Sequence, residues 1–185
     1  MHPLKSVAAA VFTAALTMAA LPSPAADFRV SSPELATGRI APAQFAGSFG
    51  CTGANQSPRI VWQNPPMGTQ SFVVTLYDPD APTGSGWWHW AVADIPADAT
   101  ELPAGAGTDA TRLPPGAVQI NTDTGSPGYL GPCPPMGQTH RYVITVTALK
   151  VDKLKLPANA TPALLGFMAN ANSLGKATLS ALGAR

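Results

Sequence analysis

Two short stretches of the chain hold the side chains best suited to acid–base or anion-binding chemistry. The first begins with Asp78 and Asp80 and reaches His89, and the second contains His140 and Tyr142. Imidazoles exchange protons near neutral pH, carboxylates fix their charge and tautomer, and imidazolium and phenol groups donate hydrogen bonds to anions. We predict that the two stretches converge on one small pocket that binds an anion.

Each of these residues also has a plainer interpretation. Asp–Pro sequences favour turns, so Asp78 and Asp80 could serve only a turn. A histidine at a strand end is often just a hydrogen-bonded polar group. We favour a site because the two stretches together hold every histidine beyond the first residues of the chain, His89 and His140.

A buried β-strand should deliver the two carboxylates. Residues 71–77 are rich in β-branched and aromatic side chains, contain no Gly or Pro, and have the length typical of a strand. Pro79 cannot donate a hydrogen bond to a sheet, so the strand must end there. The side chains of Asp78 and Asp80 share a face only if the backbone stays extended through Pro79.

Two further strands should deliver the histidines and the tyrosine. Residues 88–95 have the pattern of a strand whose alternation places His89 on the same face as Ala91. Residues 140–149 form the other candidate, and the period of two places their histidine and their tyrosine side by side at the start. The tryptophans beside the first histidine are more typical of a core than of a ligand platform: Trp87, Trp88 and Trp90.

A proline-rich loop before the last of these strands should form one wall of the pocket. It runs from Gly131 to Pro135, and its three prolines lack the N–H group that could donate to an anion. We therefore expect Gly131 and Pro135 to belong to a stiff, apolar wall.

The two aspartates raise a problem for an anion site, because two ionised carboxylates would repel a phosphate. Either one aspartate is protonated, or a histidinium neutralises it. If a histidinium supplies the positive charge, anion affinity should weaken as the pH rises past neutrality.

The first residues have the pattern of a targeting segment. Lys5 supplies the positive charge of the N-terminal region, residues 7–21 are almost wholly apolar, and residues 23–25 offer small side chains for cleavage. We predict a signal peptide over residues 1–25 and a periplasmic or secreted protein whose single domain spans residues 26–185. The alternative is an uncleaved anchor.

The chain has two cysteines, Cys51 and Cys133. An even pair in an exported protein favours a disulfide, which would tether the proline-rich loop to a distant part of the fold. The alternative is two buried thiols.

The composition fits one mainly β domain and argues against a nucleic-acid partner. Of the 185 residues, 20 are Pro and 17 are Gly, a content that suits many turns between short strands. Thr161-Pro162 is a good helix start, so we expect one or two helices. The chain has 11 Lys and Arg against 10 Asp and Glu and no basic run, whereas nucleic-acid binding depends on neutralising phosphates.

These motifs together resemble the phosphatidylethanolamine-binding protein family, also called Raf kinase inhibitor-like proteins, and most of all its bacterial branch. The resemblance spans nearly all of the chain after the leader. It is carried by these segments: Asp78-Pro79-Asp80-Ala81-Pro82, Trp88-His89-Trp90, Gly131-Pro132-Cys133-Pro134-Pro135, Gly137 and His140-Arg141-Tyr142.

The resemblance implies a fold of two packed sheets with an anion pocket at one end and a C-terminal helix near that pocket. Family members bind phosphate-bearing groups there, including phospholipid head groups. By matching position, the pocket would be lined by the following residues: Asp78, Asp80, His89, His140 and Tyr142, with Pro135 and the Gly131 loop as wall. Many bacterial members carry a histidine in the C-terminal helix region, where this chain has Asn172.

We favour a non-enzymatic protein that binds a phosphate-containing small molecule or lipid head group, without a cofactor or metal. Peripheral contact with a membrane stays open. The resemblance also implies inhibition of a protease or a kinase as an alternative, although the export signal argues against a kinase partner. A hydrolase using Asp78 or Asp80 with His89 is a further alternative, and the chain has no G-x-S-x-G nucleophile motif.

Overall fold

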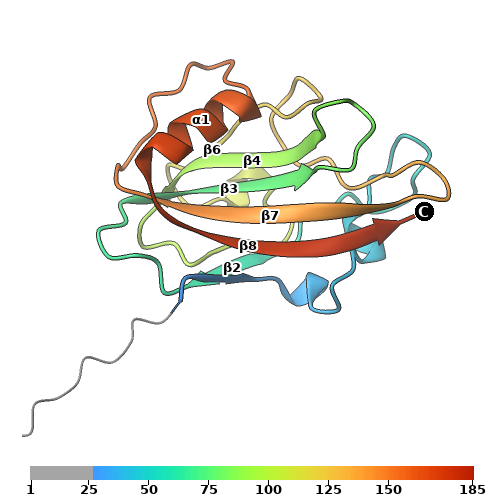
Figure 1. The fold of residues 1–185 in the computed structure, drawn as a ribbon, viewed down its shortest axis with the longest axis horizontal. Coiled ribbons are helices and arrows are strands. Elements are labelled where there is room, and N and C mark those ends of the chain that lie inside the picture. Colours follow the sequence, from blue (N-terminus) through green and yellow to red (C-terminus); the bar gives the residue numbers. More distant parts are fainter. Residues whose placement is uncertain (1–26) are drawn as a thin grey trace, which may run out of the picture.

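The computed structural model describes residues 27–185, so the predicted signal peptide lies outside the described residues. Two antiparallel β-sheets pack face to face, and one α-helix covers part of the outer face of the larger sheet (Figure 1). This arrangement confirms the prediction of a mainly β fold with two packed sheets. No helix within the described part is long and apolar enough to cross a membrane.

The larger sheet has five strands, in the spatial order β6 (Val118–Gln119), β4 (Trp87–Pro96), β3 (Ser71–Asp78), β7 (Thr139–Leu149) and β8 (Ser173–Ala184). The smaller sheet has three, in the order β1 (Arg29–Ser31), β2 (Ile60–Gln63) and β5 (Glu101–Leu102). Short 3-10 turns lie at Pro33–Leu35, Pro42–Gln44 and Ala110–Arg112. The helix α1 spans Pro162–Asn172.

The core lies between the two sheets and follows the period of two in the strands. In β3, alternate side chains from Phe72 to Leu76 point into this core. Trp62 of β2 packs on Phe72 from the opposite sheet, with 5.2 Å between the ring centroids. Other buried members of this cluster come from the four long strands of the larger sheet and from the short strand β5: Val74, Trp90, Val92, Leu102, Ile144, Val146 and Ala181.

A β-bulge changes which face of the larger sheet His89 occupies. Along β3 and β4, Leu76 is paired with Trp90, but the next residue, Tyr77, is paired with Trp88. The extra residue on β4 is His89, and a bulge of this kind re-aims a side chain. The strict alternation that placed His89 beside Ala91 is therefore wrong, because its ring contacts Tyr142 on the inner side instead.

The helix α1 packs on the outer face of the sheet, away from the end where Asp78 lies (Figure 1). It begins at the Thr161 cap, whose side chain accepts a hydrogen bond from a backbone N–H of the first turn. Its buried Leu165 packs in a cluster with Val73, at the start of β3, and Leu149, at the end of β7. The expectation that the C-terminal helix lies near the pocket is therefore wrong.

We expect Leu165→Ala to destabilise the fold by about 2–4 kcal/mol, because it removes a fully buried side chain and leaves a cavity. Phe167→Ala on the same helix should cost under about 1 kcal/mol, since that side chain is 70% exposed. Urea unfolding of both variants measures the difference. Equal losses would contradict the docking of α1 through Leu165.

Candidate functional site

A cavity of about 300 Å³ opens at the end of the larger sheet where β3 ends and where β4 and β7 begin. Its wall is completed by the loop after β3, by the proline-rich loop and by a distant N-terminal loop. The lining residues are Phe49, Asp78, Ala81, Pro82, Thr83, Trp87, His89, Leu130, Gly131, Cys133, Pro134, Pro135, His140 and Tyr142. The cavity therefore brings together six of the seven ligand-binding residues predicted from the sequence, and Asp80 is the one it does not include.

The carboxylate of Asp78 lies at the floor of this cavity and is only 2% exposed. Its Oδ1 accepts a hydrogen bond of 2.8 Å from the backbone N–H of Asp80, and its Oδ2 lies 2.7 Å from Nδ1 of His140. Burial by itself would raise the pKa of Asp78, but its interactions with His89, His140 and the Asp80 N–H outweigh burial and hold this pKa below its usual value. The buried carboxylate is therefore ionised at neutral pH.

His140 is held between two acceptors. Its Nδ1 faces Asp78, and its Nε2 lies 2.9 Å from Oε1 of Gln138. A carboxylate and an amide oxygen can only accept hydrogen bonds, so with this amide orientation both ring nitrogens donate. The arrangement thus suits an imidazolium ring, whose charge would neutralise Asp78.

His89 presents its other nitrogen to the cavity. Its Nδ1 lies 2.8 Å from the carbonyl oxygen of Leu130, and because a carbonyl oxygen only accepts, this nitrogen carries the proton. In the neutral ring Nε2 is therefore an acceptor. This nitrogen lies 4.0 Å from Oδ2 of Asp78, too far for a direct hydrogen bond.

The hydroxyl of Tyr142 is buried and makes no hydrogen bond of good geometry among the described residues, although it lies near enough to the Asp78 carboxylate for that group to affect its pKa. The residue is 1% exposed, and its ring contacts those of both His89 and His140. Burial, and then the negative charge of Asp78, raise the pKa of Tyr142 well above its usual value, so the hydroxyl keeps its proton. The indole Nε1 of Trp87, another lining residue, is also buried without a partner.

Asp80 turns away from the cavity and pairs with Arg141 at the surface. The backbone N–H of Arg141 donates to Oδ2 of Asp80 over 2.8 Å, and its Nη2 donates to Oδ1 over 3.1 Å. The hydrogen bonds from Arg141 lower the pKa of Asp80. Only one of the two carboxylates therefore lines the cavity, and it already has hydrogen-bond partners.

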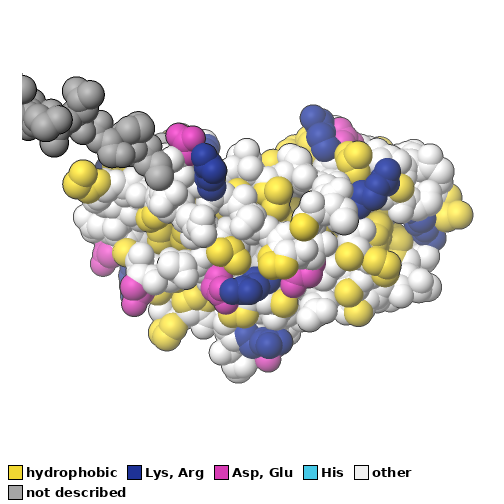
Figure 2. Space-filling model, turned by 90° about the horizontal axis from the view of Figure 1, so that it is seen from below, with side chains coloured by type: hydrophobic (Ala, Val, Ile, Leu, Met, Phe, Trp, Pro, Cys, Tyr) yellow, Lys and Arg dark blue, Asp and Glu magenta, His cyan; other side chains and the backbone are white. Residues whose placement is uncertain are grey.

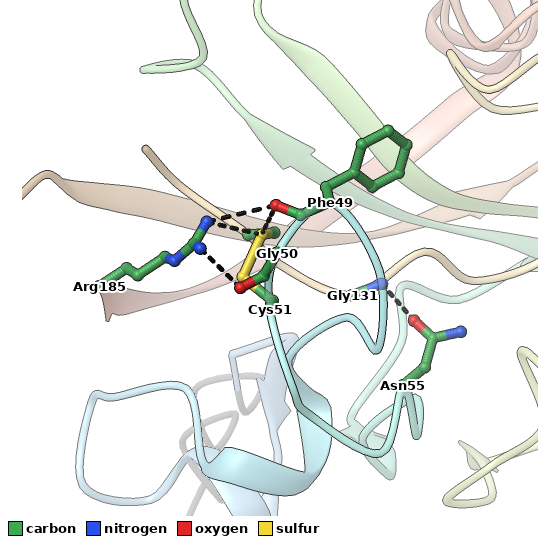
Figure 3. Close-up of a disulfide and its surroundings, with 7 residues drawn as sticks. Phe49, Gly50, Cys51, Asn55, Gly131 and Arg185 are labelled. Atoms are coloured by element: carbon green, nitrogen blue, oxygen red, sulfur yellow. Dashed lines mark hydrogen bonds between the residues drawn. A yellow bond between two sulfur atoms is a disulfide. The ribbon is translucent and has the colours of Figure 1, made fainter. Parts of the chain in front are cut away.

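A disulfide joins Cys51 and Cys133, as predicted, and closes one side of the cavity (Figure 3). The pair is 82 residues apart in sequence, so the bond ties the proline-rich loop to the N-terminal loop that carries Phe49. The guanidinium of Arg185 donates to the carbonyl oxygens of Phe49 and Gly50 (Figure 3). Phe49, with a φ of 53° and an exposed ring, is thereby fixed at the mouth.

Asn55 fixes the other wall and was not singled out by the sequence analysis. Its side-chain amide donates to the carbonyl oxygen of Tyr129. Its oxygen accepts a hydrogen bond of 2.7 Å from the N–H of Gly131 (Figure 3). These bonds flank Leu130, whose carbonyl oxygen orients His89. Because the Gly131 N–H is used in this way, it is not free to donate to a ligand. An asparagine in a polar loop gives no periodic signal that could have revealed this role.

The part of the chain that the structure describes contains no group of His, Cys, Asp and Glu arranged to hold a metal ion. Around the cavity, both ring nitrogens of His140 are engaged in hydrogen bonds with Asp78 and Gln138, and Nδ1 of His89 is engaged with Leu130.

Comparisons with known proteins agree with this architecture. Residues 31–183 match the family model described as phosphatidylethanolamine-binding protein. The Escherichia coli protein YbcL is 49% identical over 159 residues, which cover 84% of this chain and 87% of that protein. YbhB of the same organism is 48% identical over 134 residues, which cover 72% of this chain and 85% of that protein.

Solved structures give the same result. The crystal structure of Escherichia coli YbcL, described as a member of the mammalian PEBP family, superposes with a TM-score of 0.83 at 47% identity. The match covers 86% of this chain and 99% of that one. A phosphatidylethanolamine-binding protein homologue from Chlamydia trachomatis reaches a TM-score of 0.70 at 27% identity and covers 84% of this chain and 95% of its own. The chain belongs to the phosphatidylethanolamine-binding protein family, among its bacterial members.

Proposed function

We propose that this protein is a non-enzymatic binding protein for phosphate-type oxyanions, and that the cavity between β3, β4 and β7 is the binding site. The observation that carries the proposal is the Tyr142 hydroxyl, a buried donor without a partner that lies beside the Asp78–His140 pair. A buried donor left unsatisfied is costly, and an oxyanion would satisfy it.

The size and the lining of the cavity support a small ligand. A volume of about 300 Å³ lies at the lower end of the range for ligand pockets. Most of the wall is apolar, with proline, leucine and aromatic side chains, and the few polar groups converge on one end. This combination suits a phosphorylated small molecule or the head group of a phospholipid, the class of ligand that the family's name describes.

We also propose that the protein is exported to the periplasm or secreted. Support comes from the leader pattern of residues 1–25 and from the paired cysteines, since disulfides persist in oxidising compartments.

The charged side chains fit a protein without a polyanionic partner, because on the face shown in Figure 2 Lys and Arg are interspersed with Asp and Glu.

The mature protein should begin at Ala26, because Ser23-Pro24-Ala25 is the predicted cleavage site. Intact-mass measurement on protein recovered from the periplasm or the medium of the expressing cells tests this. A mass that retains residues 1–25 would contradict export by a cleaved signal.

Tyr142→Phe should weaken binding of O-phosphorylethanolamine about tenfold, because it removes one hydrogen bond to the ligand. It should not lower the free energy of unfolding of the ligand-free protein, since the lost hydroxyl had no partner. Isothermal titration calorimetry and urea unfolding give the two quantities.

Tyr129→Phe is the matched control. The Tyr129 hydroxyl donates to the carbonyl oxygen of Gln44 and does not line the cavity. This variant should therefore lose about 1 kcal/mol of stability and keep its affinity. The proposed site is wrong if Tyr142→Phe binds the ligand as wild type does, or if no binding is detected for the wild-type protein.

The ionised Asp78 should also make stability depend on pH. Its pKa is lower in the folded than in the unfolded chain, so its contribution is present above about pH 4 and is lost as the pH falls through the folded value. Asp78→Asn should be less stable than wild type at pH 7, and its stability should fall less steeply on acidification.

Asp94→Asn should have the opposite effect on how steeply the free energy of unfolding falls on acidification. Burial raises the pKa of Asp94, so this group favours the folded state as the pH falls. Its loss should make acid unfolding steeper, while Asn keeps an oxygen for the N–H of Leu154. Urea unfolding between pH 2 and pH 7 measures both slopes. Parallel curves for wild type and Asp78→Asn would contradict the ionised state of Asp78.

A further inference from the structure

The residues that line the cavity include both unpaired donors and unpaired acceptors. Tyr142 offers a hydroxyl hydrogen and Trp87 an indole hydrogen, and neither has a partner among the described residues. Two acceptors belong to the same lining, Oδ2 of Asp78 and, in the neutral ring, Nε2 of His89. They lie 4.0 Å apart and do not bond to each other. A ligand that satisfies the donors and the acceptors must accept hydrogen bonds and also donate at least one.

A fully ionised anion cannot do this. Its oxygens are acceptors only, so one of them would face Oδ2 of Asp78 without a hydrogen between them. No Lys or Arg side chain is among the cavity's lining residues. His140 reduces the charge of Asp78 but does not place a hydrogen between the carboxylate and the anion. The nearby guanidinium of Arg141 is paired with Asp80 at the surface.

We propose, building on the oxyanion function proposed above, that the site selects an oxyanion that carries its own proton: a phosphate monoester in its singly protonated form. Its P–OH group donates to Asp78 or His89, and another phosphate oxygen accepts from Tyr142. A phosphodiester, the form of phosphate in most phospholipid head groups, has no such hydrogen. The site thus favours phosphorylated small molecules over those head groups.

The groups that face the Asp78 carboxylate come from three segments of the fold. The strand β7 provides His140 and Tyr142, β4 provides His89, and the turn after β3 provides the backbone N–H of Asp80. His140 donates to the carboxylate and does not supply the missing hydrogen, because that hydrogen bond is already made. The burial of Asp78 is consistent with a carboxylate that receives a hydrogen bond from the ligand and does not supply one.

The competing explanation places the extra proton on His89. An imidazolium at this position would donate from Nε2 to any anion, including anions that have no hydrogen of their own. The two explanations therefore predict that different anions bind. They also predict different dependences of the affinities on pH.

Calorimetric titrations of the full folded protein with methyl phosphate, dimethyl phosphate and sulfate separate the two. At pH 5.5 and constant ionic strength, methyl phosphate should bind at least about tenfold more tightly than the other two, because only it can donate to Asp78. Its affinity should fall above about pH 6, where the second proton of a phosphate monoester is lost. The affinities for dimethyl phosphate and sulfate should stay low and nearly flat between pH 5.5 and pH 8.

The outcomes are distinct. If the three anions bind equally well and weaken in parallel as the pH rises, the proton resides on His89; the further inference fails, and the oxyanion site stands. If none of the three binds at up to about 10 mM, a very weak affinity even for a small ligand, the proposed function itself fails.

A variant provides an independent readout. In Asp78→Asn the side-chain amide can donate to an oxyanion, so sulfate and dimethyl phosphate should gain affinity relative to methyl phosphate, and the selectivity at pH 5.5 should largely disappear. Asp94→Asn, the same change at a carboxylate outside the cavity, should keep the wild-type selectivity. Unchanged selectivity in a folded Asp78→Asn protein would overturn the inference. If that variant does not fold, the three wild-type affinities decide alone.

Discussion

The candidate site depends on one constraint, which is that the negative charge of Asp78 is buried. A buried carboxylate is tolerated only when hydrogen bonds and opposite charge surround it. Here the turn after β3 supplies a backbone N–H, and β7 supplies the ring of His140. These requirements fix where β7 begins relative to the end of β3, and they place Tyr142, two residues after His140 in β7, at the same end of the sheet.

The opposite wall comes from loops that have no regular structure, so covalent and side-chain bonds hold it in place. The disulfide and Arg185 hold the loop of Phe49 against the proline-rich loop (Figure 3). Asn55 forms hydrogen bonds with the backbone on both sides of Leu130. Gly131 is needed here because a Cβ at this position would meet the backbone oxygen of Gln44 at 2.3 Å. The acceptor that orients His89 is therefore held in place by residues far away in sequence.

Much of this arrangement could be predicted from the sequence, and the failures have physical causes. Residues 71–77 and 140–149 are strands whose alternation is visible in the sequence, so the positions of Asp78, His140 and Tyr142 could be inferred. The face of His89 could not, because a bulge depends on how two strands pair and leaves no mark on either alone. The pattern of apolar residues in α1 shows that one side is buried, but it does not show against which part of the sheet.

The different environments of Asp78 and Asp80 would allow a site with two aspartates to accommodate the proposed anion. The backbone leaves the strand at Pro79, so the second carboxylate points to the surface, where Arg141 neutralises it. The same guanidinium is thereby kept out of the cavity. Recognition inside must then rely on hydrogen bonds instead of net positive charge, and hydrogen bonds distinguish a donor from an acceptor where a positive charge does not. Under the proposed function, a cavity built in this way would discriminate between ligands by where their protons lie as well as by their charge.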